Sequence, residues 1–173
     1  MASFPPIDIV PLVNRIAAVL RERKQTITIS ESACGGLISS YLVSVPGASE
    51  YYHGGTLTYS LKSRLKLSGW SNEDINTYTG PSEDVALRLA RNLKLELGST
   101  YTLSETGWAG PTGSSGNDSS VGTVFFAIVS PTTQTSVRKV LDNVDPEDRA
   151  GNMVKFAKLA LEFLLEVLLD KAE

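Results

Sequence analysis

The spacing of apolar residues along this chain switches repeatedly between the period of a helix and that of a strand. Residues 12–23 carry apolar side chains three or four positions apart, whereas residues 26–30 form a short β-branched run. This alternation continues along the chain and is typical of layered α/β domains. We therefore predict a three-layer α/β/α sandwich around a mixed, mostly parallel sheet. The expected helices cover residues 12–23, 37–45, 71–78, 82–97 and 145–169, and a further short helix is expected around Lys62, Arg64 and Lys66. The expected strands cover residues 26–30, 51–60, 101–104, 121–129 and 134–141. We expect the last two strands to pair in an antiparallel arrangement.

Length and composition limit the kind of protein that this chain can form. With 173 residues, of which 42% are hydrophobic and 20% charged, we expect one domain over residues 1–173. The net charge of −3 without a basic run argues against nucleic-acid binding. The single cysteine, Cys34, and the single histidine, His53, predict neither a disulfide nor a structural metal site. No apolar run is long enough to span a membrane and no signal peptide is recognisable, so we expect a cytoplasmic protein.

The segment ESACGG, residues 31–36, lies where a strand gives way to a helix. It places two nucleophiles, Ser32 and Cys34, near a helix N-terminus, whose free N–H groups attract anions. We expect the backbone N–H groups of Cys34, Gly35 and Gly36 to face an oxyanion or a phosphate. An ordinary N-cap and turn is the alternative interpretation of the same pattern.

A glycine-rich segment, TGWAGPTGSSGNDSS, covers residues 106–120. We expect its first half to belong to a functional site and its second half, SSGNDSS, to be mobile. Thr106, Gly107 and Gly110 lie in the first half, where the backbone can cradle phosphate oxygens. Trp108 is positioned either to stack on an aromatic ligand or to anchor the loop to the core.

The motifs occur in the order ESACGG, VPGAS, GGTLTYS, GPSEDVALRLARN, TGWAGPTG and VGTVFFAI, followed by an Asp-Arg pair near the last helix. In this order they resemble the C-terminal domain of the competence/damage-inducible protein A (CinA) family over residues 10–168. Stand-alone members of that family convert nicotinamide mononucleotide and water to nicotinate mononucleotide and ammonia. The resemblance thus implies a nicotinamide-nucleotide amidase that binds a phosphorylated nucleotide, needs no cofactor and forms a homodimer. Larger members carry an additional N-terminal domain, which this chain is expected to lack.

The resemblance also assigns roles to individual residues. Ser32 matches the family's proposed nucleophile, and Cys34 stands where the family pattern ESCTGG has threonine. Residues 106–111 match the TGxAGP loop. The residues expected to take part in catalysis are Ser32, Tyr59, Arg64 and Thr106, and those expected to bind substrate are Cys34, Gly35, Gly36, Gly107, Gly110 and Arg149.

The chain departs from the family pattern at the residue that is proposed to act as the catalytic base. Five positions after the tyrosine the family has a lysine that is proposed to deprotonate the serine, but here that position is Arg64, which stays protonated. Lys62 and Lys66 lie on other sides of the expected helix. Met153 likewise replaces a second family arginine.

These departures leave alternatives open. The chain is either an amidase or a catalytically silent nucleotide- or anion-binding module. Arg64 itself can serve as a phosphate clamp or form a surface ion pair. Cys34 is either a low-pKa nucleophile or a buried apolar residue. Glu105 acts as a base if it points inward and is exposed otherwise.

Overall fold

A single five-stranded sheet forms the centre of the molecule. The computed structural model describes residues 3–114 and 120–170, so residues 115–119 of the segment expected to be mobile lie outside the described residues. The strand order is β2-β1-β3-β4-β5. β1 pairs in parallel with β2 and β3, whereas β4 runs antiparallel to β3 and β5. The strands are β1 (Ile27–Glu31), β2 (Tyr52–Leu57), β3 (Tyr101–Gly107), β4 (Thr123–Val129) and β5 (Gln134–Val140).

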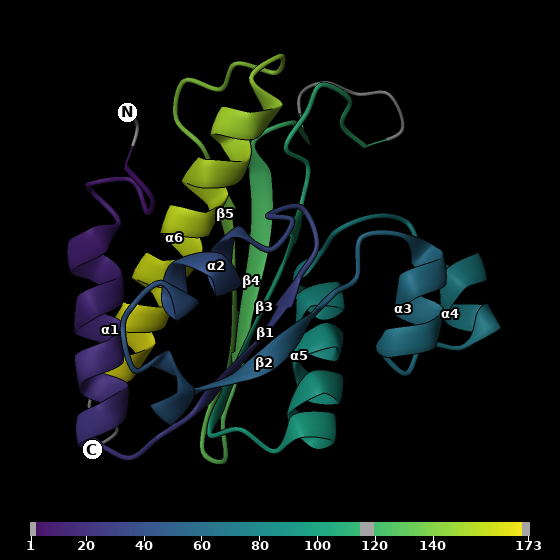
Figure 1. Cartoon of the computed structure of the whole chain (residues 1–173). Helices are drawn as coiled ribbons and strands as arrows, with labels where there is room; N and C mark the ends of the chain where they lie inside the picture. Colours follow the sequence, from purple (N-terminus) through teal and green to yellow (C-terminus); the bar gives the residue numbers. More distant parts are fainter. Residues whose placement is uncertain (1–2, 115–119, 171–173) are drawn as a thin grey trace.

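Helices cover both faces of the sheet, which confirms the predicted three-layer α/β/α architecture. In Figure 1, α1, α2 and α6 lie on one face and α5 lies on the other, with α3 and α4 set to its side. No helix in the described ranges 3–114 and 120–170 is long and apolar enough to cross a bilayer. The helices are α1 (Val10–Glu22), α2 (Leu37–Val43), α3 (Leu61–Leu67), α4 (Asn72–Asn76), α5 (Glu83–Leu97) and α6 (Arg149–Leu169), and a 3-10 turn, η1 (Ala48–Glu50), was not predicted.

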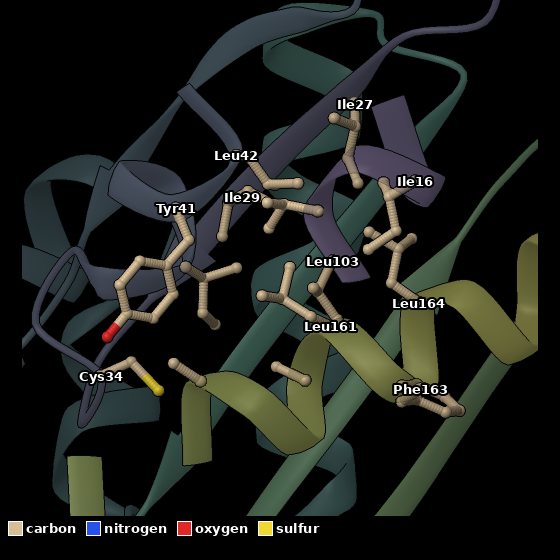
Figure 2. Packing of buried hydrophobic residues seen from close by; sticks show 14 of the residues in the cluster. Ile16, Ile27, Ile29, Cys34, Tyr41, Leu42, Leu103, Leu161, Phe163 and Leu164 are labelled. Atoms are coloured by element: carbon tan, nitrogen blue, oxygen red, sulfur yellow. The ribbon is translucent and has the colours of Figure 1, made fainter. Parts of the chain in front are cut away.

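The apolar side chains whose spacing predicted a helix over residues 12–23 are buried in α1. Ile16 of α1 and Leu161 and Leu164 of α6 pack toward Ile29 and Leu103 of the central strands (Figure 2). Because apolar burial is the main stabilising contribution to folding, this stripe fixes which side of each helix faces the sheet.

Capping side chains set the helix boundaries on the other face. Ser82 accepts a hydrogen bond from the Val85 N–H at the start of α5, and Gly98 ends that helix with a φ of 65°. Ser71 and Asp74 form a capping box at the start of α4.

Several predicted boundaries are wrong by two residues or more, among them the end of β2 at Leu57 instead of residue 60, and two of these errors have an identifiable cause. β3 continues to Gly107 instead of ending at Ser104, because its last residues still pair with β4. A Cβ at Gly107 would lie 2.6 Å from the carbonyl oxygen of Thr123, so only glycine permits this close pairing. α6 begins at Arg149 rather than Asp145, since the Asp148 side chain accepts the Gly151 N–H as its cap.

Candidate active site

The predicted motifs meet at one edge of the sheet. Ser32 follows β1, Tyr59 follows β2 closely, and Thr106 lies near the end of β3. Because these three strands are parallel, their carboxyl ends share an edge. The chain leaves β1 for β2 on one side and later enters β3 on the other, and such a switch in strand order is where open α/β sheets form ligand crevices.

A pocket of about 600 Å³ opens at this edge. It is lined by six of the predicted site residues, Ser32, Tyr59, Arg64, Thr106, Gly107 and Arg149. The other four predicted residues, Cys34, Gly35, Gly36 and Gly110, are not among its lining residues. Sequence reasoning missed the segment 78–81, which connects α4 to α5 and lines the pocket, and whose last two residues, Gly80 and Pro81, begin the GPSED motif.

Ser32 is held by a hydrogen bond on each side of its hydroxyl. Its Oγ donates to the carbonyl oxygen of Thr58 at 2.9 Å and accepts from Nη2 of Arg64 at 2.9 Å. Both partners are buried, and only 4% of Ser32 is exposed. The hydroxyl therefore faces a cation and a carbonyl, and neither of these groups is a base at neutral pH.

Arg64 is buried at the site, so the alternative interpretation of Arg64 as part of a surface ion pair is wrong. Its Nη2 also donates to Oγ1 of Thr106 at 3.2 Å, and its Nε donates to the carbonyl oxygen of Thr58 at 3.3 Å. Its guanidinium carbon lies 5.3 Å from the centre of the Trp70 ring and 5.0 Å from that of Tyr78. Lys62 and Lys66 are exposed and do not line the pocket.

Glu105 points inward, under the turn that carries Ser32. Its carboxylate accepts the backbone N–H groups of Ser32 at 3.1 Å, Ala33 at 3.2 Å and Cys34 at 2.8 Å. No hydrogen bond joins it to the hydroxyl of Ser32 among the described contacts. Glu105 is therefore placed to shape the turn, and not to take the proton of Ser32 directly.

The following residues of the turn are bonded internally as well. Glu31 accepts the N–H groups of Gly36 at 2.9 Å, Ile38 at 3.1 Å and Ser39 at 2.7 Å, which caps α2. The Gly35 N–H donates to the carbonyl oxygen of Ser32. The expectation that the N–H groups of Cys34, Gly35 and Gly36 face an oxyanion is therefore wrong, because these groups already have partners within the fold.

Burial changes the acidity of two groups in the turn. Removal from water raises the pKa of Glu105 to about 7, although the N–H groups of Cys34 and Ser32 favour its carboxylate. Burial also raises the pKa of the Cys34 thiol well above its ordinary value, and Glu105 and Glu31 add to the rise. Figure 2 shows Cys34 beside Tyr41 in the apolar core. The structure thus favours Cys34 as a buried apolar residue over Cys34 as a nucleophile.

Arg149 lies at another part of the pocket, in the first turn of α6. Its Nη2 donates to the hydroxyl of Tyr59 at 2.8 Å, and its Nη1 donates to the carbonyl oxygen of Gly110. Tyr59 is 63% exposed, so this pair is open to a ligand. The buried side chain of Asn152, which the sequence did not single out, ties the loop to α6 by donating to the carbonyl oxygens of Ala109 and Asp145.

Trp108 both anchors its loop and lines the pocket. Its ring lies edge-to-face on Phe125 with centroids 6.1 Å apart. In the ranges 3–114 and 120–170, no three histidine, cysteine, aspartate or glutamate side chains are grouped to hold a metal ion.

Comparisons with known proteins agree with this architecture. The family model of the CinA C-terminal domain matches residues 10–168. CinA-like proteins of Chlorobaculum tepidum and Salinibacter ruber are 36% and 38% identical over 90% and 83% of this chain. The chain spans only about a third of the length of these relatives, 37% and 34%.

Solved structures show the same fold. The competence/damage-inducible protein CihA of Agrobacterium tumefaciens matches with a TM-score of 0.82 and 25% identity, covering 94% of this chain and 96% of that one. The competence damage-inducible protein A of Klebsiella pneumoniae matches with a TM-score of 0.84 and 22% identity, covering 93% and 97%.

Proposed function

This chain belongs to the CinA C-terminal domain family, and from that premise we propose that it hydrolyses the carboxamide of nicotinamide mononucleotide. The products are nicotinate mononucleotide and ammonia, and Ser32 is the nucleophile. The observation that carries the proposal is the pocket of about 600 Å³ that contains Ser32 together with Arg149 and Tyr59. Its volume lies in the range typical of small-molecule sites.

The pocket offers a separate group for each part of such a substrate. The Arg149 guanidinium can pair with the phosphate, with the Tyr59 hydroxyl beside it. The ring of Trp108 lines the pocket and offers an apolar surface for the pyridine. With the phosphate at Arg149, the carboxamide lies toward Ser32.

In the proposed reaction, Oγ of Ser32 forms a bond to the carboxamide carbon, and the carbon–nitrogen bond then breaks. The leaving nitrogen departs as ammonia after gaining the proton that Ser32 loses. Water then cleaves the resulting ester, which releases the carboxylate and restores the serine hydroxyl. The Arg64 guanidinium, 2.9 Å from Oγ, supplies positive charge where the oxyanion develops, a role that the bonded N–H groups of the turn do not fill.

A second candidate function is a binding module without catalysis. It is favoured by one observation, the guanidinium that stands at the position of the family's base lysine and donates to Ser32. Because arginine does not release its proton at neutral pH, the proton of Ser32 would have to pass to water or to the substrate. The pocket would then bind a phosphorylated nucleotide and leave it unchanged.

Ammonia release from nicotinamide mononucleotide separates the two functions. We expect the unsubstituted chain to release ammonia, Ser32→Ala to lose about a thousandfold or more of that rate, and Cys34→Ala to retain it. Ser39→Ala is the matched control, because it removes a hydroxyl of α2 whose residue does not line the pocket. Nucleotide binding by the unsubstituted chain without ammonia release would instead support the binding module.

Two further parts of the proposal concern the protein in the cell. We propose that the protein is cytoplasmic and that it forms a homodimer, as its resemblance to the family implies. Light scattering on the purified chain tests the dimer, and imaging of a tagged chain tests the location.

A further inference from the structure

The charges around the pocket are all of one sign. Two arginines, Arg64 and Arg149, line it, and none of its lining residues among those described is acidic. A pocket with two cations and no carboxylate attracts a ligand with negative charge at two places. Arg149 donates to Tyr59 whereas Arg64 donates to Ser32, so the two guanidiniums are held by different hydrogen-bond partners.

Arg64 is the more unusual of the two, because it is buried without a counter-ion. Only 3% of it is exposed, and no carboxylate of the described residues forms an ion pair with it. The rings of Trp70 and Tyr78 lie near its guanidinium and shield it from water. A buried charge without a partner is costly, so a ligand anion that pairs with this cation gains affinity.

The hydrogen bonds of the guanidinium indicate what kind of anion fits. Its Nε and Nη2 are occupied by Thr58, Ser32 and Thr106. Its Nη1 is buried and has no partner among the described residues. This nitrogen can therefore still donate to an anionic oxygen of a ligand, and when the phosphate of that ligand is at Arg149, the anionic group left for Arg64 is a carboxylate.

We propose that the part of the pocket beside Ser32 is a carboxylate subsite, in which Arg64 pairs with the carboxylate of a ligand whose phosphate lies at Arg149. The naming of this ligand as nicotinate mononucleotide rests on the function proposed above. The lysine of the family pattern would place a compact cation here, whereas the planar guanidinium suits a carboxylate. The chain thus selects the acid over the amide form of the same nucleotide, and as an enzyme it retains its product.

Isothermal titration calorimetry on Ser32→Ala, in which the amide cannot be consumed, tests the selection. We expect nicotinate mononucleotide to bind about tenfold or more tightly than nicotinamide mononucleotide. The corresponding ribosides, which lack phosphate, should bind more weakly but keep the same preference. Equal or tighter binding of the amide would overturn the proposal, and so would loss of the preference in the ribosides, because the phosphate is common to both nucleotides and cannot itself distinguish the acid from the amide.

Substitution of Arg64 then identifies the residue responsible. In Ser32→Ala, the further change Arg64→Gln should abolish the preference for the acid, whereas Lys66→Gln, which removes an exposed cation from the same helix, should leave it intact. If Arg64→Gln does not fold, the preference in Ser32→Ala alone still decides the proposal. An unchanged preference in folded Arg64→Gln contradicts it. Absence of ammonia release by the unsubstituted chain overturns the amidase function but not the subsite.

Discussion

Arg64 donates to the hydroxyl of Ser32 and stays protonated at neutral pH, so it cannot itself take the proton of that hydroxyl. We predict that Arg64→Lys raises the rate of ammonia release by about tenfold or more, because a lysine beside Oγ can act as a general base and such bases contribute about 10²–10⁴-fold. The rate should be measured from pH 6 to 10. In the unsubstituted chain it should keep rising with pH, and in the variant it should level off once the new lysine is deprotonated.

Lys66→Arg provides the control, since it exchanges the same two residue types at an exposed position of α3. Equal rates for Arg64→Lys and the unsubstituted chain at every pH would show that Arg64 does not limit the proton transfer. The sequence alone revealed this departure, because the family pattern names the position. It did not reveal that Arg64 is buried between aromatic rings, since Trp70 and Tyr78 come from segments whose placement depends on the tertiary fold.

Two buried carboxylates hold the turn between β1 and α2, Glu105 at its first residues and Glu31 where α2 begins. Glu31 accepts three N–H groups at the start of α2 and is 1% exposed. We predict that Glu31→Ala lowers the free energy of unfolding by about 2–3 kcal/mol, because it leaves buried donors unpaired. Urea denaturation followed by circular dichroism measures the change. Glu50→Ala, which removes an exposed partner of Arg21, should cost no more than about 1 kcal/mol, and equal losses in the two variants would argue against the capping role.

The elements themselves were largely predictable, but some of their boundaries were not. Apolar periodicity located the helices and strands, because it reports which face each element buries. The end of β3 was missed because Thr106 and Gly107 read locally as a loop, and only their pairing with β4 makes them a strand. β3 is the central strand of a sheet covered on both faces and is buried from Thr102 to Thr106, so an alternation of apolar and polar residues could not show where Glu105 points. The start of α6 was missed because Asp145 and Asp148 are both suitable caps.

At the scale of the whole molecule, the parallel arrangement of β1, β2 and β3 creates the site. Segments distant in the sequence, around Ser32, Tyr59 and Thr106, reach one edge because these strands point the same way. The antiparallel pair β4 and β5 extends the sheet beyond β3. A sequence can reveal which motifs a chain contains and the order in which they occur, but not the hydrogen bonds between them. The hydrogen bonds that occupy the turn depend on Glu105, which arrives from a strand 73 residues after Ser32.

Glu105 also makes the stability of the whole molecule depend on pH. Its pKa is raised from an ordinary value of 4.5 to about 7 in the folded chain, mainly by burial and further by the nearby Glu31. The folded state therefore holds this proton more tightly than the unfolded state does. The resulting stabilisation is complete below pH 4.5 and is lost as the pH rises through 7, by about 3 kcal/mol in total.

We predict that the urea midpoint of the unsubstituted chain falls between pH 5 and pH 8. In Glu105→Gln, which cannot ionise, this fall should largely disappear, since the amide resembles the protonated carboxyl in size and charge. Glu50→Gln is the control, because it removes an exposed carboxylate and should leave the fall in place. A fall of the same size in Glu105→Gln would assign the pH dependence to other groups. A midpoint that rises between pH 5 and 8 would mean that the three N–H donors to Glu105 outweigh its burial and keep it ionised.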